Sequence, residues 1–212
     1  MKVAIFGATG SIGRAITAEL LARGYTVTAI TRSGGPVEGL VVRIATGDAA
    51  DTASVARLAA GQDAVVSAIG PHPGAETAED SLVGGAQGLI AGLRKSGVRR
   101  LVIVGGAGSL EVAPGLRLVD TPDFPAAWRP AALAHAAALD LCRDAEDLDW
   151  TYVSPAAVIE PGERTGAFRI GGDWLLTDES GESRISIPDF AIAVADVLER
   201  GEAIRRRITV AY

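Results

Sequence analysis

The feature that most constrains the fold of this chain is its first sixteen residues, in which three glycines separate an apolar run from an amphipathic segment. Residues 2–6 predict a short buried strand that ends at Gly7. Apolar residues recur at helical spacing after the turn and predict a helix. Gly7 permits a tight turn, Gly10 lets the backbone approach an anion, and Gly13 lets the helix pack closely on the strand. This order of elements predicts a pyrophosphate at the helix N-terminus, where free N–H groups and the helix dipole favour negative charge.

The alternative is a structural glycine turn that binds nothing, because a lone glycine triplet is a weak signal. We favour the binding interpretation, since the triplet lies directly between an expected strand and an expected helix. The residues predicted to contact the phosphates are Gly7, Thr9, Gly10, Ser11, Ile12 and Gly13.

The rest of the chain alternates expected strands with expected helices, which predicts an α/β fold with a doubly wound parallel sheet. We expect one domain spanning residues 1–212. Within it, residues 158–187 are glycine-rich and polar, and we expect them to form a small C-terminal lobe that closes over the substrate side. Segments 166–172, 174–177 and 184–187 are its expected strands. Residues 110–129 predict a long irregular loop, which is usually functional in a compact domain.

Composition excludes several classes of function. A net charge of −6 argues against nucleic acid, which calls for a basic face. One cysteine and two histidines make a protein metal site and a disulfide improbable, so we expect no metal. The sequence has no apolar run long enough to cross a bilayer and no basic-then-apolar leader. We therefore expect a cytoplasmic protein without a membrane partner, either a monomer or a dimer.

The end of the second expected strand indicates which cofactor is preferred. An acidic residue here selects NAD, whereas an arginine accommodates the 2′-phosphate of NADP. The chain has Arg32 and Ser33 at this place, and no carboxylate before Glu38. Arg14, next to the last glycine, could assist from the helix. These residues favour NADP(H), with NAD(H) possible; the alternative is that Arg32 is an ordinary solvated residue.

Three segments carry a resemblance to a known family. Gly-Ala-Thr-Gly-Ser-Ile-Gly at 7–13, Gly-Gly-Ala-Gly-Ser at 105–109 and Ser-Pro-Ala-Ala-Val-Ile-Glu-Pro at 154–161 resemble the atypical short-chain dehydrogenases/reductases. Within that superfamily the chain is similar to the NAD(P)H-binding, NmrA-like proteins, NADH–flavin reductases among them, and to biliverdin IXβ/flavin reductase. The resemblance implies an NAD(P)-binding Rossmann fold.

The resemblance also implies roles for individual residues. Asp48 and Ala49 would contact the adenine, and Ala68, Ile69 and Gly70 would run beneath the ribose and nicotinamide side. Pro155 would lie where backbone contacts the nicotinamide amide. Ser109 would hydrogen-bond the substrate or the reacting end of the cofactor, and it is the catalytic candidate.

The acid/base dyad of the superfamily is missing. Most members use a Tyr with a Lys four residues later, but the only lysines are Lys2 and Lys95. Ala29 follows Tyr25 at that spacing, and Ala156 follows Tyr152. Any chemistry must therefore proceed without this dyad.

The missing dyad leads to three hypotheses. The first is a reductase that moves a hydride from NADPH to a flavin, a quinone or a similar planar acceptor, for which solvent supplies the proton. His72, Phe124 and Trp128 are the candidate acceptor-binding residues, with exposure or packing as the alternative. The second is a non-catalytic NADP(H) sensor of the NmrA type. The third and weakest is an epimerase or dehydratase.

Overall fold

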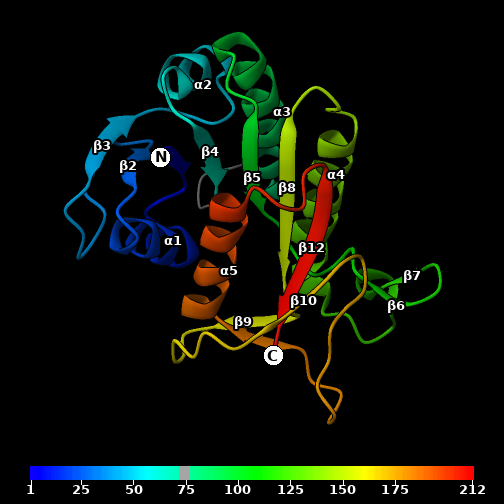
Figure 1. Ribbon diagram of the computed structural model, residues 1–212. Helices are drawn as coiled ribbons and strands as arrows, with labels where there is room; N and C mark the ends of the chain where they lie inside the picture. Colours follow the sequence, from blue (N-terminus) through cyan, green and yellow to red (C-terminus); the bar gives the residue numbers. More distant parts are fainter. Residues whose placement is uncertain (72–76) are drawn as a thin grey trace.

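The core of the molecule is an eight-stranded, mostly parallel sheet, seen in a computed structural model that describes residues 1–71 and 77–212 (Figure 1). The strand order is β10-β12-β8-β5-β4-β1-β2-β3, and only β10 runs antiparallel to its neighbour. The strands are β1 (Lys2–Phe6), β2 (Thr26–Thr31), β3 (Arg43–Thr46), β4 (Ala64–Ser67), β5 (Arg100–Val104), β8 (Asp149–Pro155), β10 (Arg169–Gly171) and β12 (Arg206–Ala211). The order 3-2-1-4-5 is that of the dinucleotide-binding doubly wound sheet, so the predicted fold class is confirmed.

Helices cover both faces of this sheet. One face carries α1 (Ser11–Ala22) and α5 (Ile187–Arg200), which contact each other. The opposite face carries α2 (Thr52–Ala59), α3 (Ala78–Ser96) and α4 (Arg129–Arg143). Two apolar cores result, one on each side of the strands. Parallel strands buried on both faces read as continuous apolar runs, which is how β1 and β5 read in the sequence.

Local signals set the ends of several helices. Asp51 caps α2 by accepting a hydrogen bond from the Ala53 N–H at 2.9 Å, as its sequence position predicts. Ser186 caps α5 through the Asp189 N–H. Gly201 ends α5 in a left-handed conformation with φ of 61°.

Small residues let α3 lie very close to the start of α2. A Cβ on Gly88 would lie 2.1 Å from the carbonyl oxygen of Ala49, and one on Gly92 would lie 2.5 Å from the Val55 side chain. These distances are far below van der Waals contact, so only glycine fits. The close approach carries the N-terminal part of α3 to the edge of the sheet where β1 and β4 end.

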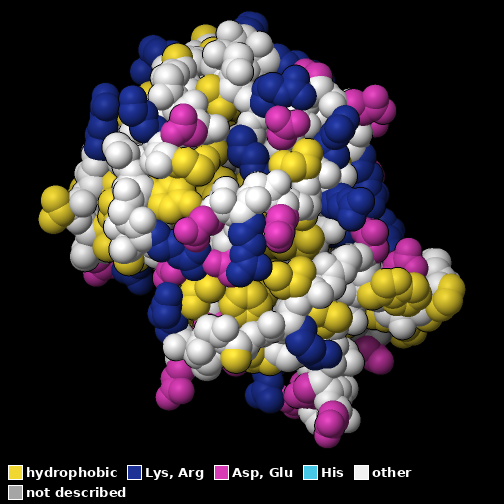
Figure 2. All heavy atoms as spheres, in the orientation of Figure 1, with side chains coloured by type: hydrophobic (Ala, Val, Ile, Leu, Met, Phe, Trp, Pro, Cys, Tyr) yellow, Lys and Arg dark blue, Asp and Glu magenta, His cyan; other side chains and the backbone are white. Residues whose placement is uncertain are grey.

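The segment expected to be an irregular loop is more ordered than the sequence indicates. Residues 110–129 contain the hairpin β6 (Glu111–Ala113) and β7 (Leu116–Arg117), followed by two 3₁₀ turns, η1 (Leu118–Asp120) and η2 (Ala126–Trp128). The hairpin projects from the side of the molecule and carries exposed Val112 and Leu116 (Figures 1 and 2). The prediction of a structureless loop was therefore wrong.

The segment predicted to form a small lobe is divided between two places. β10 joins the edge of the central sheet, whereas β9 (Val158–Glu160) and β11 (Arg184–Ser186) form a separate parallel pair. The strand expected at 174–177 is absent, and Trp174 instead makes an isolated bridge to Glu111. The role of this segment on the substrate side stays a prediction.

Candidate functional site

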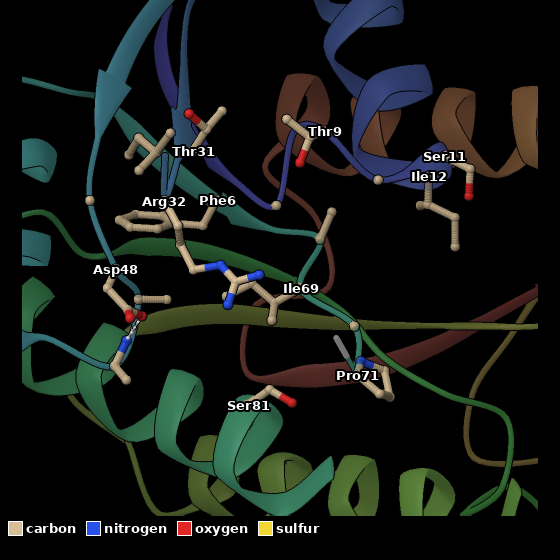
Figure 3. Close-up of a pocket in the computed structure, with 18 residues that line it drawn as sticks. Phe6, Thr9, Ser11, Ile12, Thr31, Arg32, Asp48, Ile69, Pro71 and Ser81 are labelled. Carbon is tan, nitrogen blue, oxygen red and sulfur yellow. Dashed lines mark hydrogen bonds between the residues drawn. The ribbon is translucent and has the colours of Figure 1, made fainter. Parts of the chain in front are cut away.

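A large cleft lies at the carboxyl ends of β1, β2 and β4, where ligands bind in doubly wound folds (Figure 3). We call it the main cleft, and its volume is about 740 Å³. Eleven of the predicted cofactor residues line it: Gly7, Thr9, Gly10, Ser11, Ile12, Arg32, Asp48, Ala49, Ala68, Ile69 and Gly70. The sequence did not single out its other lining residues, which are Phe6, Ile30, Thr31, Gly47, Ala50, Pro71 and Ser81. The structure therefore brings together residues from five separate parts of the chain.

Two of the three glycines are required by the protein's own packing. Gly7 has a φ of 80°, and a Cβ there would lie 2.4 Å from the carbonyl oxygen of Ala68. A Cβ on Gly13 would lie 2.1 Å from the carbonyl oxygen of Gly7. Gly13 thus packs α1 against the turn, and it is not among the described residues that line the main cleft.

Gly10 is different, because nothing within the described chain requires a glycine there. Its φ of −70° suits any residue, and a Cβ would meet only the Gly7 carbonyl oxygen, at an ordinary 3.6 Å. Gly10 also lines the main cleft. A bare backbone at this point leaves room for a ligand to approach, so the residues present fit a dinucleotide pyrophosphate.

The N-terminus of α1 gives the turn its preference for anions. No side chain caps this helix. The N–H groups of Ser11, Ile12 and Gly13 are in the first turn, where no helical carbonyl can accept them. They would hold a phosphate through hydrogen bonds and the helix dipole.

Arg32 and Asp48 line the end of the main cleft that is predicted to hold the adenosine, which we call the adenosine end. Arg32 follows β2 directly, and Figure 3 shows its side chain extending into the cleft toward Ile69. Asp48 follows β3, and its Oδ1 accepts a hydrogen bond from the Ala50 N–H at 2.9 Å. That bond orders the turn and leaves the rest of the exposed carboxylate available to a ligand.

The wall opposite the glycine turn comes from α3. Ser81 lines the cleft from the first turn of this helix, near Ala50 and Pro71. No local signal identifies Ser81, because its position depends on the close packing at Gly88. Phe6, Ile30 and Thr31 could have been identified, since each is the last or next-to-last residue of a strand that ends at the cleft.

Several predicted site residues lie elsewhere. Arg14 makes an ion pair with Glu38, and Ser33 is exposed; neither is among the described residues that line the main cleft. Pro155 is the buried last residue of β8.

The predicted acceptor-binding residues Phe124 and Trp128 are also outside the cleft lining, and Trp128 is 65% exposed. His72 lies outside the described residues, so its predicted role stays open.

Ser109, the catalytic candidate, is held against the side of the sheet. Its Oγ accepts a hydrogen bond from Arg207 at 2.9 Å, and its carbonyl oxygen accepts another at 3.1 Å. Arg207 is buried and also makes an ion pair with Asp173 at 2.6 Å. Ser109 thus anchors the loop after β5, and it is absent from the described lining of the main cleft. Its catalytic role stays a prediction that this geometry does not favour.

Tyr152 on β8 contacts His135 on α4. The Tyr152 hydroxyl donates to the carbonyl oxygen of His135 at 2.7 Å, and burial raises the pKa of this hydroxyl well above its usual range. Burial lowers the pKa of the His135 imidazole to about 4. Both groups are therefore neutral at pH 7, and neither is poised to exchange a proton there.

Neither a cluster of metal ligands nor a membrane-spanning helix is present among the described residues. Among residues 1–71 and 77–212, no three His, Cys, Asp or Glu side chains lie together as metal ligands would. Within the same described part, no helix combines the length and the apolar character needed to span a bilayer.

The fold and the glycine-lined cleft define a nucleotide-binding α/β protein. The profile of the NAD(P)H-binding family matches residues 7–200, and the chain belongs to this family. It is an NAD(P)H-binding, oxidoreductase-like protein of the atypical short-chain dehydrogenase/reductase kind.

Similar proteins support this assignment over the full chain. The chain is 39% identical over 213 residues to the uncharacterized protein YwnB of Bacillus subtilis (strain 168), covering 99% of this chain and 98% of YwnB. A "putative exported protein" from Burkholderia pseudomallei has 50% identity and a TM-score of 0.91, covering 100% of both chains. A "putative NADH-flavin reductase" from Streptococcus pneumoniae TIGR4 has 36% identity and a TM-score of 0.87, covering 100% of this chain and 99% of its own. A "putative epimerase" from Bacteroides thetaiotaomicron has 36% identity, a TM-score of 0.89, and coverage of 100% of this chain and 96% of its own.

Proposed function

We propose that this protein is an NADPH-dependent reductase that transfers a hydride to a flavin, a quinone or a similar conjugated acceptor. The observation that carries the proposal is a cleft lined by predicted dinucleotide-binding residues, with no activated proton donor beside it among residues 1–71 and 77–212. Tyr152 and His135 are neutral and hydrogen-bonded within the protein, and the Tyr-x-x-x-Lys pair is absent.

The preference for NADPH rests on Arg32. Its guanidinium extends from the end of β2 into the main cleft, and a planar fork of donors matches a phosphate. No carboxylate lies between the end of β2 and Glu38 to bind the ribose hydroxyls of NADH.

The choice of acceptor follows from proton balance. NADPH gives up a hydride, which carries two electrons, and becomes NADP⁺. A flavin or quinone takes the hydride at a ring atom and one proton from water, so no strong protein acid is needed. A simple ketone develops an alkoxide and depends on a positioned acid, and the described residues around this site supply none. The protein then contributes orientation of two planar rings.

The test is oxidation of NADPH, followed by absorbance at 340 nm, with FMN, riboflavin and a soluble quinone as acceptors. A panel of aldehydes and ketones serves as the contrast. We expect turnover only with the conjugated acceptors. Turnover of ketones but not of flavins or quinones would reject the proposal.

Arg32→Asp tests the phosphate contact in the same assay. We expect kcat/KM for NADPH to fall by at least tenfold and that for NADH to change little, since a charge-assisted contact contributes about 1.5–3 kcal/mol. Asp63→Asn is a suitable control, because Asp63 contacts the N–H of Lys2 at the opposite end of β1. If Arg32→Asp left the cofactor preference unchanged, the proposed contact between Arg32 and the 2′-phosphate would be rejected.

A sensor function is the second candidate, and one observation favours it. Ser109, Tyr152 and His135, the polar groups around the expected reaction centre, all make bonds within the protein. A protein of this kind would bind NADP(H) tightly, turn over no acceptor and dock on a partner. Calorimetry that finds tight NADPH binding, together with no turnover in the acceptor panel, would favour the sensor.

A further inference from the structure

One exposed ion pair joins the two elements that border the adenosine end of the main cleft. Arg14 Nη1 lies 2.7 Å from Glu38 Oε2. Arg14 follows Gly13 on α1, and Glu38 belongs to the connection that begins with Arg32 and leads to β3. The pair therefore bridges the helix that would hold the pyrophosphate and the segment that would hold the ribose phosphate.

The connection is fixed at this place by its neighbour. Val37 is 1% exposed and packs in the core on the α1 side of the sheet. The N–H of Leu40 donates to the carbonyl oxygen of Val37, which turns the backbone around Glu38. Glu38 is thereby held beside α1 although its own side chain is 88% exposed.

The charges matter because the 2′-phosphate of NADPH carries nearly two negative charges at neutral pH. A guanidinium beside the phosphate attracts it, and a carboxylate on that guanidinium cancels the attraction. NADH has only a hydroxyl at this position, so the same change of charge affects it much less.

We propose that Glu38 is a specificity-determining residue which occupies Arg14 and thereby weakens the preference of the main cleft for NADPH over NADH. This inference rests on the dinucleotide-binding part of the proposed function and not on turnover. Arg14 is outside the described lining of the main cleft, so NADPH binding would require its side chain to turn from the carboxylate to the phosphate. Exchange is easy, because an exposed pair of this kind contributes little to stability.

The experiment measures the Kd of NADPH and of NADH by calorimetry for the wild-type chain, Glu38→Gln, Arg14→Gln and the double variant. We expect Glu38→Gln to lower the Kd of NADPH about two- to fivefold, which is the range of an exposed ion pair. The Kd of NADH should not change. Arg14→Gln should raise the Kd of NADPH. Adding Glu38→Gln to the Arg14→Gln variant should have no further effect on that Kd. The gain in Glu38→Gln should shrink in 0.5 M salt because the charges are exposed.

Asp147→Asn is the matched control. Asp147 makes an exposed ion pair with Arg94, also at 2.7 Å. Arg94 lies in the last turn of α3, about 20 Å from Ser81 at a rise of about 1.5 Å per residue. Asp147→Asn should change neither the Kd of NADPH nor the Kd of NADH. The inference would be overturned if Glu38→Gln changed the Kd of both nucleotides equally or changed neither. It would also be overturned if Glu38→Gln still lowered the Kd of NADPH in the absence of Arg14. If the wild-type chain bound neither nucleotide, the proposed function itself would fail, which is a distinguishable result.

Discussion

Arg164, between β9 and β10, makes a two-pronged ion pair with Glu19 on α1, with distances of 3.0 and 3.2 Å. Glu19 is 8% exposed and also accepts a hydrogen bond from Arg23 at 2.9 Å. A segment far along the chain thus braces the helix whose first turn borders the main cleft. Burial alone would raise the pKa of Glu19, but the bonds from Arg164 and Arg23 outweigh burial and lower it.

The lowered pKa of Glu19 predicts a pH dependence of stability. A carboxyl whose folded pKa is below its unfolded value stabilises the fold above the unfolded pKa of about 4.3, and this contribution is lost as pH falls through the folded pKa. We expect Glu19→Gln to lower the free energy of unfolding by about 2 kcal/mol at pH 7. Urea unfolding should show this deficit narrowing toward pH 3, and a deficit independent of pH would contradict the assignment. Glu179→Gln, at an exposed position, is the control.

The packing of α3 predicts opposite results for two glycines of the same helix. A Cβ on Gly88 would lie 2.1 Å from the Ala49 carbonyl oxygen, whereas one on Gly84 would meet only the Ala50 Cβ at 4.0 Å. Gly88→Ala should lower the free energy of unfolding by about 1–3 kcal/mol. It should also weaken nucleotide binding, because the wall of the main cleft must move. Gly84→Ala should raise the free energy of unfolding by up to about 1 kcal/mol, because alanine has the higher helix propensity.

Thermal unfolding and calorimetry with NADPH check both glycine variants. Equal effects at the two positions would mean that helix propensity, and not the contact with Ala49, decides the outcome.

Much of the fold can be predicted because its signals are local. The run Lys2–Phe6, the glycines of the turn and the cap at Asp51 each act within a few residues, so pattern and position suffice. The hairpin in 111–117 was missed because its strands are short and alternate weakly. The place of β10 at the sheet edge depends on pairing with β12, which lies about forty residues later and leaves no local trace.

The candidate site divides in the same way. Residues next to strand ends, such as Arg32 and Asp48, were predictable because parallel strands end at one edge of the sheet. Ser81 was not, because it reaches the main cleft only through the fit of Gly88 against Ala49. Ser109 was assigned from resemblance alone, and its bonds to Arg207 depend on a strand almost a hundred residues away.

The single cysteine should be inert in the folded protein. Cys142 is 1% exposed, and burial raises the pKa of its thiol to about 12. Because the thiolate is the reactive form, we expect no reaction with a disulfide reagent at pH 8 over hours in native buffer, and one equivalent in 8 M urea. Absorbance of the released thiol measures this, with Cys142→Ala as the blank. Reaction within minutes under native conditions would show that this part of α4 opens readily.

Burial of His135 predicts a second pH dependence, in a range above that of the carboxyl groups. The pKa of His135 is lowered to about 4, against about 6.5 when unfolded. Between these values the unfolded chain binds a proton that the folded chain does not, so stability is full above pH 6.5 and falls as pH drops. The slope is about 1.4 kcal/mol per pH unit, or about 2 kcal/mol lost from pH 6.5 to 5. Urea unfolding in a His72→Gln background, where His135 is the only histidine, should show this loss, and adding His135→Gln should abolish most of it. A loss that remained unchanged in the double variant would mean that burial does not lower the pKa of His135, so that its imidazole could titrate near its usual range and take part in proton transfer.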